Sequence, residues 1–493
     1  MSLVIINQFD GGQAEDIRTF ATNEQETSYN FDIYTKPQYL IPYIDMIAET
    51  VTSGTITDFA ITDVDAITVS GTTSLVALGR ASLVSNAPQF FRKNSSSDIT
   101  SGWQSYATGV NNVVAGSLVV YKGFAYCLGD TTAAHNLQKF DGTSSVSTIG
   151  VLGGYSTPCA KPFVHPEDNK LYMGSANIVS RYNGTTFDAT ALTLPDDKMI
   201  VSLTSYGGYL AIACRPKNGI GNSVCYLWDV GSAPTTVQSV MDLGAGQVNI
   251  VENLYNNLFF TVTKSVVGSY NSVTSNTLAI KGYAGGAVET LKEVSLSSTL
   301  GTALNVFKQK RNEHLYFAFS NDTAIYRFGK GKNGSYFLSH DRAYPSGTTT
   351  VSGFSLIGDF MWLGYSTNAT ANLFWRTRAS SESQSFATVS TYKTTINPSM
   401  PLEDRYKHKQ LEAVSISISA GSTCNFKYSV DGSAMTSIIA DTSDSGEITI
   451  EASALADNSP FLDGREYQFQ AETTGDGRIK EIRYKYRVLA SQL

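Results

Sequence analysis

The chain of 493 residues contains few charged residues. Only 16% of them are Asp, Glu, Lys or Arg, and the formal net charge is −7, whereas soluble domains contain about 25% charged residues. A protein that holds nucleic acid by neutralising phosphates needs a basic surface, so the acidic balance argues against that class. The same balance is compatible with a surface along which DNA slips without sticking.

Signatures of metal binding and of a disulfide framework are missing. The cysteines show no CxxC spacing and the histidines no HxH or HExxH pattern, so no zinc site or other cofactor is predicted. A bond between Cys214 and Cys225 across a hairpin is left open. The histidines are interpreted as surface or turn residues: His135, His165, His314, His340 and His408. The cysteines are Cys127, Cys159, Cys214, Cys225 and Cys424.

Long hydrophobic runs are also missing. The first ten residues hold one short apolar run, Leu3-Val4-Ile5-Ile6, with no basic region before it, which does not fit a signal peptide. No apolar run approaches the roughly 18 residues that span a bilayer. We therefore expect a chain made in a cytoplasm, without an encoded address and without membrane insertion.

Strand-forming and turn-forming residues are abundant instead. The chain contains 27 Tyr, 24 Phe and 41 Gly, and it has no long runs of Glu, Lys, Ala and Leu. Aromatic residues favour strands and glycine favours tight turns, while strong helix formers in long runs are needed for helices. This composition predicts an all-β protein.

An internal repeat indicates the architecture. A polar turn, an apolar strand and an aromatic-bearing strand recur, as in Asp168-Asn169-Lys170-Leu171-Tyr172 followed by Ser180-Arg181-Tyr182. Seven equivalent apolar positions lie 39 to 57 residues apart, close to the 40–50 residues of a four-stranded propeller blade. The pattern predicts a seven-bladed β-propeller over residues 55–395, because a parallel β-helix has shorter repeats and separate sandwiches need about 100 residues each. These positions are Leu75, Phe124, Leu171, Leu210, Leu258, Leu315 and Met361.

Two regions fall outside the repeat. Residues 1–54 contain prolines and extended aromatic segments, which predict an extended N-terminal arm. Residues 396–493 alternate apolar and polar side chains with period two, for example at Ile482, Tyr484 and Tyr486, which predicts half-buried antiparallel strands of a small C-terminal β-sandwich. The two prolines of Asn397-Pro398-Ser399-Met400-Pro401 predict a linker between propeller and sandwich.

No catalytic constellation emerges from the sequence. There is no GxSxG elbow, and Gly329–Ser335 lacks the spacing of a phosphate loop and is interpreted as a hairpin tip. The segment Tyr428–Gly432 partly matches the sialidase Asp-box but lacks its second glycine and its tryptophan. Six acids near predicted turns are interpreted as turn formers: Asp130, Asp141, Asp168, Asp229, Asp322 and Asp359. Trp103, Trp228, Trp362 and Trp375 are candidates for sugar binding on a rim, with core packing the default interpretation.

The N-terminal segment carries the most specific motif. Phe9-Asp10-Gly11-Gly12 is followed by Tyr29-Asn30-Phe31-Asp32-Ile33 and by Tyr39-Leu40-Ile41-Pro42-Tyr43. This order resembles the arm that leads into a propeller in virion proteins of tailed bacteriophages. The whole layout is similar to the β-propeller tail nozzle and packaged-DNA-stabilising proteins of short-tailed phages, although the C-terminal sandwich does not match that family.

The resemblance implies a structural virion subunit without catalytic activity. It would form a ring of identical subunits, six in number, in the tail or neck below the portal. The ring would contact other tail or portal-adaptor proteins and line a channel for double-stranded DNA during ejection. A basic cluster in the C-terminal region would set the register between subunits, with a solvated strand face as its simpler interpretation: Arg465, Arg483, Lys485 and Arg487. A receptor- or glycan-binding tail protein is the alternative, and a propeller glycosidase is a third hypothesis.

Overall fold

The computed structural model describes most of the chain. The described residues are 2–6, 25–29, 31–32, 41–43, 46–48, 60–80, 88–93, 103–107, 112–114, 116–131, 133–156, 159–219, 221–231, 236–264, 275–300, 306–320, 322, 324–331, 334–344, 350–366, 372–377, 389–419, 423–439, 448–455 and 459–489. Within them, forty β-strands and one 3₁₀ turn (Leu402–Asp404) occur and no α-helix. The predicted all-β class is confirmed.

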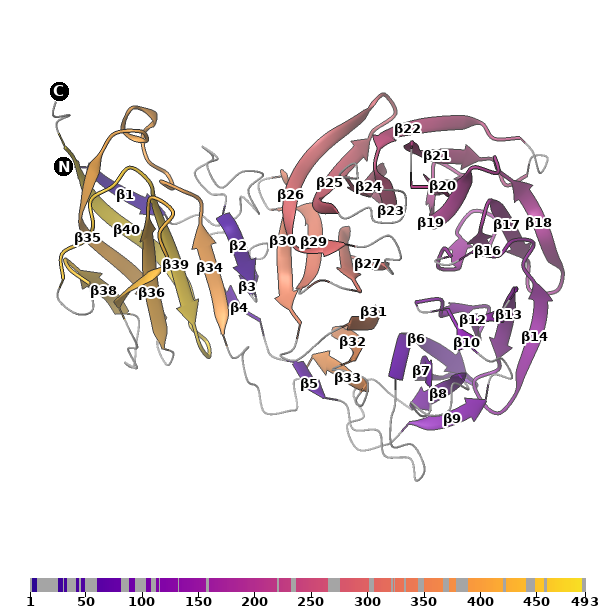
Figure 1. Cartoon of the computed structure of the whole chain (residues 1–493). Helices are drawn as coiled ribbons and strands as arrows, with labels where there is room; N and C mark the ends of the chain where they lie inside the picture. The colour runs from indigo at the N-terminus through magenta and orange to yellow at the C-terminus, as the bar shows by residue number, and fades with distance from the viewer. Residues whose placement is uncertain are drawn as a thin grey trace. The chain divides into compact units, whose positions relative to one another are not determined.

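Seven consecutive antiparallel sheets form a β-propeller in the described part of the chain (Figure 1). In five of the first six sheets, four strands follow one another in sequence order from the common centre to the periphery; in the second blade, β10 and β11 both pair with β12, which is followed by β13 and β14. The first three blades comprise β6 (Ala60–Val69), β7 (Thr72–Arg80), β8 (Pro88–Lys93) and β9 (Gln104–Ala107); β10 (Asn112–Val113), β11 (Val119–Tyr121), β12 (Phe124–Asp130), β13 (His135–Phe140) and β14 (Val146–Val151); and β15 (Phe163–His165), β16 (Lys170–Ser175), β17 (Ile178–Tyr182) and β18 (Phe187–Thr193).

The remaining four blades repeat this pattern. Their strands are β19 (Lys198–Tyr206), β20 (Tyr209–Pro216), β21 (Asn222–Trp228) and β22 (Ser239–Ala245); β23 (Gln247–Leu254), β24 (Asn257–Thr263), β25 (Ser275–Tyr283) and β26 (Val288–Leu300); β27 (Val306–Arg311), β28 (His314–Phe319), β29 (Ala324–Lys330) and β30 (Tyr336–Ala343); and β31 (Thr350–Ile357), β32 (Phe360–Ser366) and β33 (Asn372–Thr377), joined by β5 (Met46–Ala48). The predicted seven-bladed propeller is therefore confirmed.

The repeat seen in the sequence corresponds to the second strand of each blade. All seven equivalent positions, Leu75 to Met361, lie in β7, β12, β16, β20, β24, β28 and β32. The third strand of the fifth blade was predicted at 268–270, which lies outside the described residues; the observed third strand is β25, Ser275–Tyr283.

Tight turns connect the first and second strands of the blades. Six of the seven described connections are two residues long, and positive φ angles occur in each, for example at Lys122 (48°) and Gly123 (78°). Such turns match the right-handed twist of hairpin strands. Tyr255 and Glu313 adopt positive φ despite large side chains; the Glu313 carboxylate accepts a hydrogen bond of 2.6 Å from the Tyr255 N–H, which ties the turns of blades five and six together.

The first strands close into a ring. Contacts join β6 to β11, link β15, β19, β23, β27 and β31 in succession, and return from β31 to β6. Strand β5 reinforces the closure of the propeller between its last and first blades, because it precedes β6 in the sequence and completes the sheet of β31, β32 and β33. The last blade thus combines strands from both ends of the propeller sequence.

The C-terminal region forms two further sheets around a shared core. One has the order β1 (Ser2–Ile6), β40 (Ile479–Val488), β35 (Lys409–Ile418), β38 (Ile448–Ala452); the other has the order β2 (Gln25–Tyr29), β34 (Ser390–Thr394), β39 (Tyr467–Thr473), β36 (Cys424–Val430), β37 (Thr436–Ile439). Ile416, Phe426, Phe469 and Tyr484 from both sheets are buried in one cluster. The predicted sandwich is confirmed, and its alternating residues face inward as expected.

The predicted arm, residues 1–54, contributes edge strands to these sheets. Strands β1 and β2 join the sandwich, β5 joins the propeller, and β3 (Phe31–Asp32) pairs with β4 (Ile41–Pro42). Directly after β4, the Tyr43 hydroxyl donates to Asp341 at 2.7 Å and the Tyr43 ring lies under the Arg342 guanidinium at 4.4 Å. Tyr43 therefore anchors the arm on β30.

The segment 397–401 is not the predicted linker. Asn397 is buried; its side-chain amide donates to the carbonyls of Arg405 and Arg465, and its side-chain oxygen accepts from the Tyr467 N–H. These bonds build a packed corner of the sandwich. The chain forms two compact units, Met1–Met46 with Ala324–Tyr344 and Ser380–Leu493, and Ile47–Thr323 with Pro345–Ala379. The unit that contains the sandwich thus includes residues 380–395 and 324–344, which the sequence assigned to the propeller.

Candidate functional site: the central cavity of the propeller

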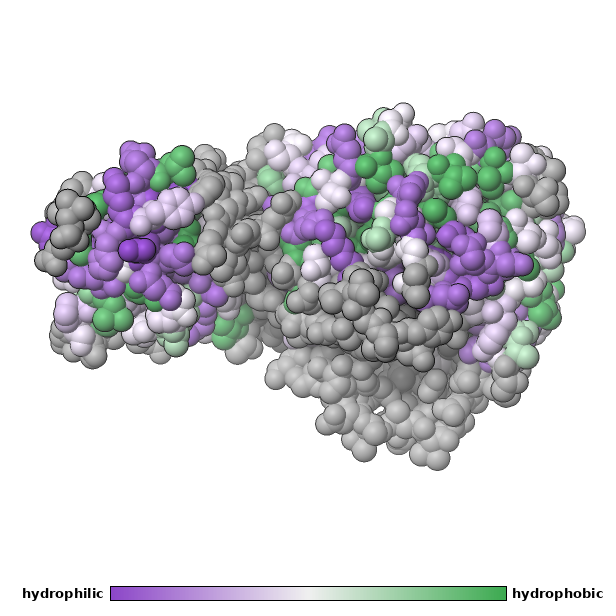
Figure 2. Space-filling model, turned by 45° about the horizontal axis from the view of Figure 1, so that its top comes forward, coloured by the Kyte–Doolittle hydropathy of each residue, from purple (hydrophilic) through white to green (hydrophobic). Residues whose placement is uncertain are grey.

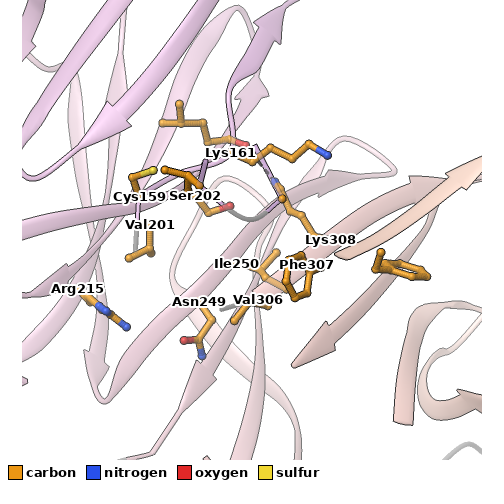
Figure 3. Close-up of a pocket in the computed structure, with 14 residues that line it drawn as sticks. Cys159, Lys161, Val201, Ser202, Arg215, Asn249, Ile250, Val306, Phe307 and Lys308 are labelled. Atoms are coloured by element: carbon orange, nitrogen blue, oxygen red, sulfur yellow. Dashed lines mark hydrogen bonds between the residues drawn. The ribbon is translucent and has the colours of Figure 1, made fainter. Parts of the chain in front are cut away.

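A small cavity lies among the first strands of the propeller blades, within the larger contact unit (Figure 3). Its volume is about 50 Å³, which is room for a few water molecules. Several polar side chains face it together with apolar ones. We call it the central cavity and define it by Lys161, Ser202, Arg215, Asn249, Phe307 and Lys308.

Asp63 on β6 gathers four donors beside this cavity. Its carboxylate accepts from Ser355 Oγ at 2.6 Å, from Lys161 Nζ at 2.8 Å, and from the N–H groups of Val64 and Leu118 at 3.0 and 3.1 Å. These partners belong to blade seven, the start of blade three, blade one and blade two. A buried carboxylate is stable only when its lone pairs are satisfied, so Asp63 acts as a fastener between blades.

Asp65 extends this connection one step along β6. It accepts hydrogen bonds from the N–H groups of Ala66 and Val120 at 2.8 and 3.1 Å, which join blades one and two a second time. Burial raises the pKa of the Asp65 carboxyl, while the charge of Lys161 opposes this effect. The alternation of Asp63 and Asp65 with Val64 places both carboxylates on the same face of β6.

Lys308 performs the same task on the opposite side of the ring. Its ammonium donates to the carbonyls of Leu203 and Val251 at 3.0 and 2.6 Å and to Glu252 at 2.9 Å. Glu252 also accepts from Thr204 Oγ1 and from the Asn253 N–H. Since an ammonium has three protons, Lys308 is fully used in joining blades four, five and six.

Arg215, near the end of β20, is the third cation of the central cavity. Its only hydrogen bond to a described residue runs from Nη1 to Gln247 Oε1, at 3.4 Å. Burial lowers the pKa of Arg215 to about 10. The guanidinium is thus charged at neutral pH, and no carboxylate of a described residue pairs with it.

The acids that the sequence suggested as candidates do not converge. In the described part of the chain, none of the six lines the central cavity. Asp141 accepts from the N–H groups of Thr143, Ser144 and Ser145; although burial opposes this, these bonds lower its pKa to about 2. Asp229 accepts from the Gly231 N–H in a similar turn. Their interpretation as turn formers is confirmed, whereas Asp322 is buried.

Three histidines were interpreted incorrectly. His135, His165 and His340 are buried rather than in exposed turns. His135 lies 3.4 Å from Asp130 and 2.8 Å from the Ser156 carbonyl, and His165 lies 3.3 Å from Asp168. Sequence patterns alone do not reveal these pairs, because each histidine meets its aspartate only once the hairpin between them has formed. His408 is exposed and His314 is half-buried.

The other sequence candidates have structural roles. Trp103, Trp228 and Trp362 are buried, as the core interpretation predicted, and Trp103 packs edge-on against Trp362 at 6.2 Å. The Gly331 N–H donates to the Ser335 carbonyl between β29 and β30, which confirms the hairpin tip. Asp431 and Gly432 have positive φ angles and form the turn after β36.

All five cysteines are free. Cys214 pairs in register with Val224, and Cys225 pairs with Ala213; the two thiols belong to core clusters on opposite faces of their sheet. No disulfide joins them. No group of three metal-binding side chains was found among the residues that the structure describes, and no described helix is long and apolar enough to cross a membrane.

The residues of the central cavity were missed at the level of sequence. Asp63, Lys161, Glu252 and Lys308 lie in or beside first strands of different blades, and Arg215 lies near the end of a second strand, β20. One signal was available, namely charged residues within otherwise apolar alternating strands. Their partners, however, lie up to 292 residues away and are specified only by closure of the ring.

Similar structures are propellers. No known protein family and no curated protein match the sequence. The WD40 β-propeller domain of Doa1 aligns with 68% of this chain and 98% of its own, at 12% identity and a TM-score of 0.44. YCF48 from Cyanidioschyzon merolae gives the same coverage and identity with a TM-score of 0.41. An exo-β-1,3-galactanase from Phanerochaete chrysosporium aligns over 90% of this chain and 99% of its own, at 11% identity and a TM-score of 0.29. At these identities and scores the likenesses carry no argument about function.

Proposed function

We propose that the chain is a structural subunit of a bacteriophage virion that works by self-association and has no catalytic activity. The observation that carries this proposal is that the carboxylates beside the central cavity are engaged in holding blades together. Asp63 is held by four donors and Glu252 by three, so both serve to join blades. A glycosidase needs two carboxyl groups facing a sugar across a gap of roughly 5–9 Å, whereas Asp63 and Glu252 are each surrounded by donors from the protein itself.

Recognition of a glycan is the second candidate function, and the tryptophans do not favour it. Three of the four tryptophans are buried in the core and offer no ring for stacking on a sugar. On the face of the propeller that Figure 2 turns toward the viewer, hydrophobic and hydrophilic residues are interspersed. A receptor-binding tail protein therefore remains the alternative rather than the proposal.

More specifically, we propose that the subunit occupies a nozzle-like position in the tail or connector. Its support is the N-terminal segment, whose resemblance to phage tail proteins was noted from the sequence and whose Tyr43 fastens the arm through Asp341 and Arg342. The narrow central cavity leaves no path for a DNA duplex through the propeller itself. DNA would instead pass through a channel between subunits of a ring of six, and the net charge of −7 would keep it from sticking.

A surface suited to contact between subunits lies on the outer face of the β1–β40–β35–β38 sheet. Leu3 and Ile5 on the edge strand β1 are 53% and 42% exposed. They lie opposite Lys485 and Arg483 of β40, whose side chains are exposed like that of Arg487. Apolar residues beside a charged row fit an interface with a hydrophobic centre and a polar rim.

Localisation and enzymology together test the proposal. Antibody-gold labelling of purified virions from a phage that encodes the chain is expected to mark the tail or neck, and a hydrolysis screen against bacterial polysaccharides is expected to show no turnover. Label restricted to host cells without virions would contradict the virion role. Turnover that is abolished by Asp130→Asn, but not by the exposed-turn variant Asp359→Asn, would contradict the non-enzymatic role.

A further inference from the structure

Arg215 stands out among the charged residues of the central cavity. Its side chain is 6% exposed, and its single hydrogen bond to a described residue goes to the neutral amide of Gln247. Figure 3 shows Arg215 and Asn249 in the same part of the cavity. The Asn249 amide nitrogen donates to the Gln247 carbonyl and to Thr263 Oγ1, so it supplies no negative charge to Arg215.

The other two cations of the cavity have counter-charges. Lys161 is paired with Asp63 and Lys308 with Glu252, and no described carboxylate pairs with Arg215. Among the described residues, the cavity therefore carries one positive charge more than the carboxylates beside it neutralise.

An isolated buried charge is costly. Moving an ion out of water costs several kcal/mol even after the protein relaxes, and burial already lowers the pKa of this guanidinium to about 10. At neutral pH the group stays protonated and needs a counter-ion. A guanidinium offers several N–H donors in a planar fork that fits two oxygens of one oxyanion.

We propose that the central cavity binds one small oxyanion of the phosphate or sulfate type on Arg215. The volume of about 50 Å³ equals the space of roughly three or four water molecules, which suits a tetrahedral anion and excludes a nucleotide. The ammonium of Lys161 also lines this cavity, and among the described residues its one acceptor is Asp63. The bound ion would join blades four and five, to which Arg215 and Gln247 belong. This inference is independent of the proposed role in a virion.

Inorganic phosphate is the probe for this site, with sodium chloride of equal ionic strength as the reference. Calorimetric titration of the full chain is expected to show one phosphate per chain. The melting temperature is expected to rise by a few degrees at saturating phosphate, because a ligand that binds only the folded state stabilises it. Sulfate should act similarly. A phosphate effect no larger than that of chloride would overturn the proposal.

Variants assign the effect to Arg215. Arg215→Met is expected to abolish the phosphate-dependent rise while melting no lower than the wild type in phosphate-free buffer, because the substitution removes an unneutralised buried charge. Arg181→Met is the matched control: Arg181 is paired with Asp188 outside the cavity, and this variant should retain the full rise. If Arg215→Met does not fold, Arg215→Lys, which keeps the charge without the fork, should weaken binding at least tenfold. Unchanged phosphate binding in either Arg215 variant would overturn the assignment.

Discussion

At the scale of single residues, buried charges fasten segments that lie far apart in the sequence. Asp63 joins four blades, Lys308 joins three, and in the sandwich Lys409 donates to the carbonyls of Asp404, Arg405 and Lys407 at 2.9, 3.0 and 2.8 Å. Each of these groups is surrounded by several hydrogen-bonding partners, as buried polar groups require. Their loss should therefore cost more than the loss of a surface ion pair.

Asp63→Asn tests the fastener of the propeller. The substitution removes the carboxylate that pairs with Lys161. It also places the N–H₂ group of the new amide, itself a donor, among groups that donate hydrogen bonds to Asp63. The free energy of unfolding should therefore fall by about 3 kcal/mol. Chemical denaturation measures it. Asp359→Asn, in an exposed turn, is the control and should change stability by less than about 0.5 kcal/mol. Equal effects of the two substitutions would contradict the role of Asp63.

Lys409→Met tests the fastener of the sandwich. The side chain is fully buried, and although Asp404 opposes the effect, burial lowers its pKa to about 8. Methionine fills a similar volume but leaves three carbonyls without their donor, so stability should fall by about 2–4 kcal/mol. Lys407→Met removes an exposed lysine paired with Asp404 and should cost at most about 1 kcal/mol. A smaller loss for Lys409 than for Lys407 would refute this account.

At the scale of elements, the sequence predicts those strands that recur in the repeat or that alternate apolar and polar side chains. The second strands were found because an apolar strand after a polar turn recurs seven times, and the strands β35, β36, β39 and β40 were found because their inward residues alternate. Strand β5 was not predicted, since Met46-Ile47-Ala48 pairs with a strand more than 320 residues away. The corner at 397–401 was missed because its order depends on side-chain bonds of Asn397 rather than on backbone preference.

Tyr43 tests whether the arm is part of the fold. Tyr43→Phe removes the hydroxyl that donates to Asp341 but keeps the ring under Arg342, so thermal unfolding should reveal a loss of about 1–2 kcal/mol. Tyr43→Ala also removes the cation–π contact and should lose about 1 kcal/mol more. If both variants melt like the wild type, the arm is not held by this residue.

At the scale of the whole molecule, burial of many thiols and phenols predicts how stability depends on alkaline pH. Burial raises the pKa of Cys127, Cys214 and Cys225, and burial together with the charge of Asp130 raises that of Cys159 to about 12. The pKa of Tyr392 is raised by burial as well. The folded state therefore keeps protons that the unfolded state releases near pH 9 to 10.

These groups should therefore leave the free energy of unfolding unchanged below about pH 8.5. They should lower it as the pH rises through 9 and 10 toward the raised pKa values. Lys409 acts in the opposite direction between about pH 8 and its ordinary value of 10.5, and so does Arg215 above about pH 10, but the thiols and phenols with raised pKa values outnumber them. Denaturant unfolding at pH 8, 9, 10 and 11 measures the trend. A free energy of unfolding that rises over this range would contradict the burial of these side chains.

Buried carboxylates beside the central cavity join blades, and the exposed Leu3 and Ile5 beside Lys485 and Arg483 offer a surface for the proposed contact between copies. The central claim is therefore assembly. The most direct test is negative-stain electron microscopy of the purified full chain, combined with its mass in solution. The account predicts ring-shaped particles with the mass of six copies of the 53.2-kDa chain. Particles of single-chain mass at every concentration, both in solution and in dissociated virions, would contradict it.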